Sequence, residues 1–189
     1  MPKTTRRVGG AAVVVTCLVW ASGAVDTEAG AVVAGQPSVM ASDTRVRGAS
    51  ARVVAIINKA AAQSETFRGL VDEIDHTDGI VYVAKSDCGS GVRACLLLTM
   101  TMMGPNRLIR ILVDPRAADR DLMASIGHEL QHAVEVLSYP SVRSSSQMIL
   151  LYKRICDVCG RSFETNAAVR AGDAVRAELH ESAEAERRE

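Results

Sequence analysis

Aromatic side chains are scarce in this chain, and neither sign of charge is in excess. Aromatic residues make up only 3% of the 189 residues, whereas hydrophobic residues of all kinds make up 48%. A core built from this composition must be aliphatic, and the length suits one domain. The formal net charge is zero, so the chain lacks the basic excess that is typical of nucleic-acid-binding proteins. We therefore expect one domain and no nucleic-acid partner.

The N-terminal segment also lacks a hydrophobic run of membrane-spanning length. Its apolar run covers residues 8–19, whereas a transmembrane helix needs about 20 apolar residues. A basic start, a short apolar run and the small residues 22–24 are together typical of a secretory signal peptide. We therefore predict a signal peptide over residues 1–24, with an uncleaved N-terminal anchor as the alternative. The protein is then secreted or extracytoplasmic, in the periplasm or cell envelope, and any membrane tether is confined to this segment.

The composition also predicts the N-terminal boundary of the folded domain. Residues 25–50 are mostly Ala, Gly, Ser, Val and Thr without periodicity, which is typical of a flexible linker. We place the folded domain at residues 51–184 and a charged tail at residues 185–189.

Hydrophobic spacing within the domain indicates an α+β fold. Apolar residues recur every three or four positions in helices and alternate or run together in short strands. The pattern predicts N-terminal helices, a short three-stranded sheet, a central helix and C-terminal helices. The helices are expected at about residues 49–63, 64–74, 119–137 and 147–155 and from about Ser162 onward, and the strands at 80–86, 94–103 and 107–114.

Four cysteines follow the predicted signal peptide, and their even number favours disulfides in an oxidising compartment. Cys88 and Cys95 flank a turn between two predicted strands, so we predict a disulfide between them. Cys156 and Cys159 form a CxxC pair, which suits a tight disulfide, a redox pair or half of a structural zinc site. A single CxxC is a weak metal signal, so we expect a disulfide or free thiols here.

Two of the four histidines lie in the stretch "ASIGHELQHAVEVL". His128 and His132 are four residues apart, so a helix projects both from one face, about 6 Å apart along its axis. That spacing lets two imidazoles bind one metal ion, and Glu129 lies close enough to act as a general base. The alternative is a pair of buried, hydrogen-bonded histidines without a metal.

The stretch "GHELQHAVEVL" resembles the active-site helix of the zincin metallopeptidases, and it is also similar to small uncharacterised secreted bacterial proteins built around HELQHA. In zincins a mixed sheet precedes this helix, and its edge strand holds the substrate backbone. The resemblance implies a small zincin-like domain with a catalytic zinc ion. It also implies that His128 and His132 are zinc ligands and that Glu129 is the catalytic glutamate.

A catalytic zinc usually has three protein ligands, so a third is expected. Metzincins continue with a glycine and a third histidine, which this chain lacks. Glu135 lies about 10 Å along the helix from His128, which is too far for it to bind the same metal ion readily. Its expected role is that of an exposed charge on the helix or of a hydrogen-bond partner of a metal ligand. The gluzincins, which the chain resembles more closely, complete the site with a glutamate on a later helix. That implies Glu164 as the third ligand, although a glutamate can also simply stabilise a helix start.

One departure from the gluzincin pattern concerns the groups that orient the histidines. The family has an acidic residue four positions after the third ligand, where this chain has Ala168. Asp173 or a backbone carbonyl is then expected to orient His128 and His132, because such partners normally fix the tautomer of a metal-binding histidine.

Taken together, the residues and the resemblance predict a zinc-dependent peptidase that acts on a peptide or protein substrate. Tyr139, Tyr152 and His76 are candidate donors to the oxyanion. The alternative is an exported zinc-binding or regulatory module without catalysis, and the sequence leaves the oligomeric state open.

Overall fold

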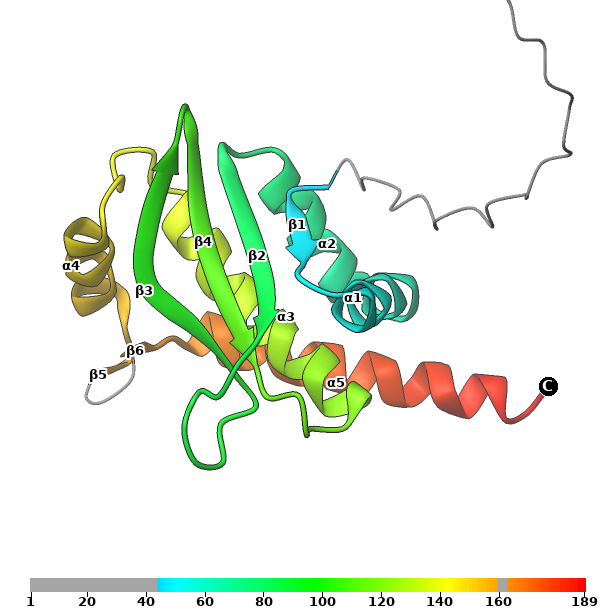
Figure 1. Ribbon diagram of the computed structural model, residues 1–189. Coiled ribbons are helices and arrows are strands. Elements are labelled where there is room, and N and C mark those ends of the chain that lie inside the picture. The colour runs from blue at the N-terminus through cyan, green and yellow to red at the C-terminus, as the bar shows by residue number, and fades with distance from the viewer. Residues whose placement is uncertain (1–43, 160–162) are drawn as a thin grey trace, which may run out of the picture. The chain divides into compact units, whose positions relative to one another are not determined.

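A computed structural model describes residues 44–159 and 163–189 of the chain. Within these ranges the protein is α+β, with five helices, a four-stranded mixed sheet and a small two-stranded sheet (Figure 1). The predicted α+β class is therefore confirmed. The predicted signal peptide, residues 1–24, and most of the predicted linker lie outside the described residues.

Two consecutive helices open the domain, α1 (Ala51–Gln63) and α2 (Glu65–Asp75). Serine caps begin both of them: the side chain of Ser50 accepts a hydrogen bond from Val53 N, and that of Ser64 accepts one from Phe67 N. Each cap satisfies one of the amides that a helix start leaves unpaired. The two helices lie where hydrophobic spacing predicted them.

The main sheet has the strand order β1-β2-β4-β3. Its strands are β1 (Val46–Gly48), β2 (Gly79–Lys85), β3 (Ala94–Met103) and β4 (Asn106–Val113). Strands β1, β2 and β4 run parallel, and β3 is antiparallel to β4 at one edge. The three longer strands match the prediction, but the expected three-stranded sheet has a fourth strand. Since β1 pairs with β2 inside the expected linker, ordered structure begins before residue 51.

Edge strand β3 is irregular in its middle. Leu96 pairs with Ile111 of β4, but the next paired residue, Met100, pairs with Ile109, so β3 has two extra residues between these pairs. A bulge of this kind bends a strand and redirects its side chains and amides. The amide of Met100 turns outward, where it donates to Ser145 Oγ at 3.0 Å.

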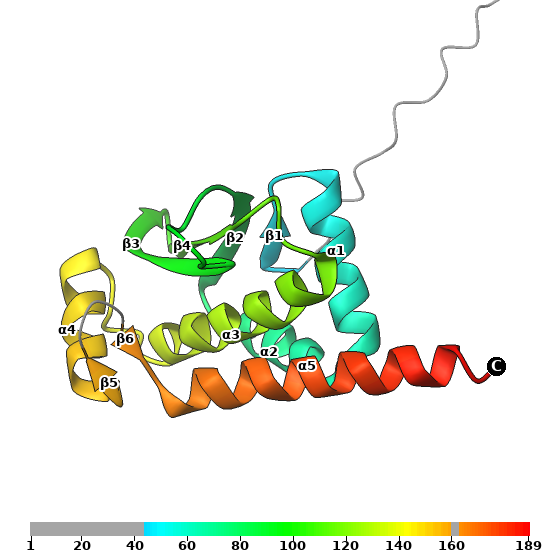
Figure 2. The ribbon, with the colours of Figure 1, turned by 90° about the horizontal axis from the view of Figure 1, so that it is seen from below.

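Helix α3 (Asp119–Leu137) lies between the sheet and the long last helix, α5 (Asn166–Glu186) (Figure 2). Helix α3 is buried along most of its length. Its exposed charged residues are accordingly confined to its first turn, at residues 119–121. Helix α4 (Ser145–Ile155) lies beside β3. No helix within the described ranges is long and apolar enough to cross a membrane.

The start of the last helix differs from the prediction. We expected a helix from about Ser162 that would include Glu164, but α5 begins at Asn166, with the side chain of Thr165 as its cap. Phe163 and Glu164 instead form strand β6, which pairs antiparallel with β5 (Val158–Cys159). The helix continues through Glu186, so the predicted charged tail begins within it.

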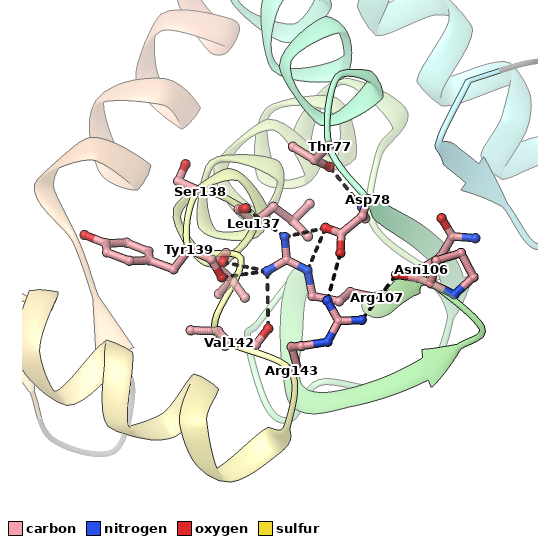
Figure 3. Close-up of polar contacts among 12 residues, drawn as sticks. Thr77, Asp78, Asn106, Arg107, Leu137, Ser138, Tyr139, Val142 and Arg143 are labelled. Atoms are coloured by element: carbon pink, nitrogen blue, oxygen red, sulfur yellow. Dashed lines mark hydrogen bonds and ion pairs between the residues drawn. The ribbon is translucent and has the colours of Figure 1, made fainter.

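A buried arginine fastens the C-terminal end of α3 to the sheet. The side chain of Arg107, on β4, is only 1% exposed and forms an ion pair with Asp78. Its guanidinium also donates to main-chain carbonyls at and beyond the end of α3, those of Val136, Leu137, Tyr139 and Val142 (Figure 3). Helix ends leave such carbonyls without partners, so Arg107 satisfies several of them at once.

Candidate metal centre

The two histidines of the HExxH stretch lie side by side on α3. Their ring centroids are 5.0 Å apart, with the ring planes nearly perpendicular. The His132 side chain is 7% exposed and that of His128 is 22% exposed. The helical spacing therefore brings both imidazoles to one partly open face, as the sequence predicted.

Strand β6 brings Glu164 to the same place. Its Oε1 atom lies 3.0 Å from His128 Nε2 and 3.4 Å from His132 Nε2. One ligand atom from each of His128, His132 and Glu164 lies within 4.8 Å of the other two. The strand pairing and the helix cap at Thr165 hold Glu164 at the end of β6, so an extended segment rather than a helix presents this carboxylate.

Glu135 fixes the orientation of His132. Its Oε2 atom lies 3.0 Å from His132 Nδ1, and its Oε1 atom accepts a hydrogen bond from the Thr165 hydroxyl at 2.6 Å. Because a carboxylate only accepts, Nδ1 of His132 must carry the proton, which leaves Nε2 of the neutral ring with a lone pair. Of the two sequence-based possibilities for Glu135, the structure therefore has the partner of a histidine and excludes the exposed helix charge.

The Nε2 atoms of both histidines consequently converge on one carboxylate oxygen, Glu164 Oε1. Glu164 Oε1 is buried and has no hydrogen-bond donor among the described residues, although His128 Nε2 is only 3.0 Å away. A buried, unpaired carboxylate oxygen is costly. A proton or a metal ion among these atoms removes that cost, and two ligands of a tetrahedral zinc ion are about 3.3 Å apart. The donor set of two imidazoles and one carboxylate thus fits a divalent metal.

Carboxylates around His132 also affect its protonation. Burial disfavours the charged ring, but the hydrogen bond to Glu135 and the charges of Glu129, Glu135 and Glu164 outweigh burial and raise the pKa of His132. Without a metal, the cluster therefore favours a positive charge at this position. A cation is the chemical species that the arrangement attracts.

Glu129 points from α3 toward the edge strand. Its Oε2 atom accepts a hydrogen bond from the main-chain amide of Leu96, on β3, at 2.8 Å. Burial raises the pKa of Glu129, and the neighbouring His132 and His128 and the Leu96 amide offset only part of this effect. One carboxylate oxygen is thus held by the strand, and a carboxyl group with a raised pKa is suited to proton transfer.

A cavity of about 550 Å³ opens beside these groups. Its polar side includes Glu129, His132, Tyr152 and Glu164, and its apolar side includes Val92, Ala94, Leu96, Leu98 and Phe163. A concave site with an apolar wall and a few convergent polar groups is typical of a ligand-binding pocket.

Only one of the three candidate oxyanion donors lines this cavity. The Tyr152 hydroxyl donates to the main-chain carbonyl of His132 at 2.8 Å, and burial with the charges of Glu135 and Glu129 raises its pKa well above the usual value. Tyr139 lines a different hollow, and His76 Nδ1 lies 2.6 Å from the carbonyl of Asp72. The structure therefore does not bring Tyr139 or His76 to the site.

The groups that support the histidines differ from those expected. Asp173 is exposed and pairs with Arg176 rather than with a histidine. Helix α5 contributes Gly172 instead, against which His128 packs: a Cβ atom at that glycine would lie 3.1 Å from His128 Cβ. The sequence offered no signal for this contact, because it depends on how two distant helices cross.

Both cysteine pairs are disulfides, Cys88–Cys95 and Cys156–Cys159. The first confirms the predicted pairing around the turn. The second selects the disulfide from the possibilities that were open for the CxxC pair.

We find no match of this chain to any protein-family model, to any curated protein or to any solved structure. The function of the domain must therefore be inferred from the site itself.

Proposed function

We propose that this domain is a zinc-dependent peptidase in which His128, His132 and Glu164 hold the metal and Glu129 is the general base. One observation carries the proposal: three ligand atoms converge, and the buried Glu164 Oε1 among them has no hydrogen-bond donor within the described part of the chain. The zincin-like sequence pattern and this geometry point to the same three side chains.

Zinc is the metal that best fits the donor set. Two imidazole nitrogens and one carboxylate oxygen are typical of catalytic zinc, which takes three protein ligands and leaves one position for water or substrate. Within residues 44–159 and 163–189, no other His, Cys, Asp or Glu joins the group. The cavity adjoins this group of side chains, which favours a catalytic over a purely structural metal.

The side chains of the chain have distinct tasks in the proposed reaction. A zinc ion bound by His128, His132 and Glu164 would supply a Lewis acid for the scissile carbonyl and would lower the pKa of water to about 7. Glu129 takes a proton from the attacking water and delivers it to the leaving amine. The Leu96 amide donates to one oxygen of Glu129 and so holds the base in place. Glu135 holds the ring of His132 so that its Nε2 lone pair is directed toward His128 and Glu164.

A peptide or protein substrate fits the surroundings of the site. The cavity runs along residues of β3, which is an edge strand, and edge strands can pair with an extended peptide. The apolar wall suits a hydrophobic side chain of the substrate. The balanced net charge argues against nucleic acid as the substrate.

A second candidate is an exported zinc-binding or regulatory module without catalysis. It is favoured by the burial of Glu129 and its hydrogen bond to a main-chain amide, since a glutamate with a purely structural role has the same environment. The two disulfides suit an oxidising compartment under either function, and we propose an extracytoplasmic location.

Three substitutions separate the two functions. The parent protein should bind about one zinc per chain and hydrolyse an unfolded protein substrate. Glu129→Gln should retain zinc and lose nearly all hydrolysis, because it keeps the shape and removes the base. Glu164→Ala and His128→Ala should weaken zinc binding itself, since each removes a ligand.

Elemental analysis, zinc titration and a hydrolysis assay measure these outcomes, with circular dichroism as the check of folding. Full hydrolysis by Glu129→Gln would reject the peptidase and favour the binding module. Undiminished zinc affinity in Glu164→Ala, with loss in Glu135→Ala, would show that Glu135 is the third ligand.

A further inference from the structure

Each disulfide is connected through the main chain to a different functional group of the candidate site. Cys95 directly precedes Leu96, whose amide holds Glu129. Cys159 lies on β5, which pairs with the strand that carries Glu164. The two bridges are on separate elements, so their effects on the site can be separated.

The Cys88–Cys95 disulfide closes the loop between β2 and β3, and it does so at the residue directly before Leu96. Leu96 is the last residue of β3 in regular pairing before the bulge that precedes Met100. The bulge interrupts the pairing with β4 on one side of Leu96, and the disulfide constrains the strand on the other. The Leu96 amide, which donates to Glu129 Oε2 at 2.8 Å, thus directly follows a residue that the disulfide holds.

The Cys156–Cys159 disulfide acts at the other end of the site. Cys156 ends α4, where its amide donates to the carbonyl of Tyr152 at 2.9 Å. From there the chain enters β5, and the amide of Asp157 donates to the carbonyl of Glu164 at 2.8 Å. The disulfide closes this short turn, so it fixes the strand against which the main chain of Glu164 is aligned.

We infer that the two disulfides divide the positioning of the site: Cys88–Cys95 positions the base Glu129, and Cys156–Cys159 positions the metal ligand Glu164. This inference rests on the proposed function. The histidines lie on α3, outside both disulfide-closed loops, so neither bridge is needed to bring His128 and His132 together. Loss of the first bridge should therefore affect catalysis with zinc in place, and loss of the second should affect zinc binding.

The test compares two double variants, each serving as the control for the other. C88S/C95S should keep the zinc dissociation constant within about threefold, while kcat falls about tenfold or more and KM changes less. Amide hydrogen exchange at Leu96 should become faster in this variant, with or without substrate. C156S/C159S should raise the zinc dissociation constant about tenfold or more, and saturating zinc should restore its hydrolysis.

Two proline variants test the same links without removing a disulfide. Leu96→Pro removes the amide that holds Glu129, at a position of edge strand β3 where that amide donates to Glu129 and not to β4. Asp157→Pro removes the amide that holds the Glu164 carbonyl. Leu96→Pro should lower kcat further than Leu96→Ala, and Asp157→Pro should weaken zinc binding further than Asp157→Ala, because the alanine variants lose the side chains but keep the amides. If a serine variant does not fold, these single variants test whether the main-chain hydrogen bonds position Glu129 and Glu164 separately.

The expected difference between the two double variants can be disproved while the proposed function still holds. If the parent binds zinc and hydrolyses substrate but both double variants lose the same property, or neither loses any, the division between the bridges is overturned. If the parent binds no zinc, the proposed function is rejected and the inference with it.

Discussion

Glu135 and His132 lie one turn apart on α3, and their side chains meet at 3.0 Å between Oε2 and Nδ1. The carboxylate is in turn held by the Thr165 hydroxyl at the start of α5. Two helices thus cooperate to orient one imidazole. A histidine held in this way presents its other nitrogen in a fixed direction, which is the arrangement that metal-binding histidines commonly have.

We predict that Glu135→Gln weakens zinc binding about 10- to 100-fold, because the ring loses a charged partner that raises its basicity. Competition with a chromogenic chelator measures the affinity. Glu181→Gln, an exposed position on α5, is the matched control and should bind as the parent does. Equal affinities for the two variants would show that Glu135 does not orient a ligand.

Gly172→Ala should also weaken zinc binding, by about tenfold, because the added methyl group would lie 3.1 Å from His128 Cβ, where α5 packs against α3. We expect a loss of stability of about 1–3 kcal/mol from the same overpacking. Gly69→Ala is the control: its added Cβ meets nothing within 4 Å, and removing a helical glycine should stabilise the fold by about 0.4–1 kcal/mol. Urea denaturation and zinc titration measure both effects. A Gly172→Ala variant as stable and zinc-competent as Gly69→Ala would contradict the close packing.

Arg107→Met should destabilise the domain by about 3–5 kcal/mol, since several carbonyls near the end of α3 lose their donor and Asp78 keeps only its 3.5 Å ion pair with Arg143. Denaturant unfolding measures the change. Arg110→Met, at an exposed position of the same strand, should change stability by less than about 0.5 kcal/mol. Similar values for the two variants would mean that the buried guanidinium contributes little.

Glu178 should give the fold a pH-dependent stability. Burial favours its neutral form, but hydrogen bonds from Ser64 and Thr66 outweigh burial and lower its pKa. A lowered folded-state pKa stabilises the protein fully above the ordinary value and loses that effect as the pH falls through the folded-state value. Glu178→Gln should therefore melt below the parent at pH 7, with a difference that shrinks as the pH falls below 4.5. A difference that stays constant with pH would exclude this linkage, and Glu181→Gln should show no difference at either pH.

The sequence predicted the elements that have strong local periodicity or caps. Helices α1 to α4 and the three longer strands follow apolar spacing, serine caps and turn residues, all of which are local signals. Strand β1 has only three residues, too few to show alternation. The predicted start of α5 is too early, because the side chain of Thr165 caps the helix and α5 begins at Asn166.

The candidate site was predictable where its chemistry is encoded in a short spacing, as with His128, Glu129 and His132. Its supporting contacts were not predictable in the same way. The Leu96 amide is a main-chain group with no residue-type signal, and the partners of Arg107 are mostly carbonyls. The packing of Gly172 against His128 is set by the crossing of α3 and α5, which no local pattern describes.

The place of Glu164 in the chain has a consequence for when the proposed site can form. A ribosome synthesises both histidines and Glu129 well before Glu164, and α5, whose Gly172 packs against His128, comes later still. A nascent chain that ends before β6 therefore carries only two of the three proposed ligands. For an exported protein, zinc capture would then follow translocation, and the metal would come from the compartment in which the domain folds rather than from the one in which it is made.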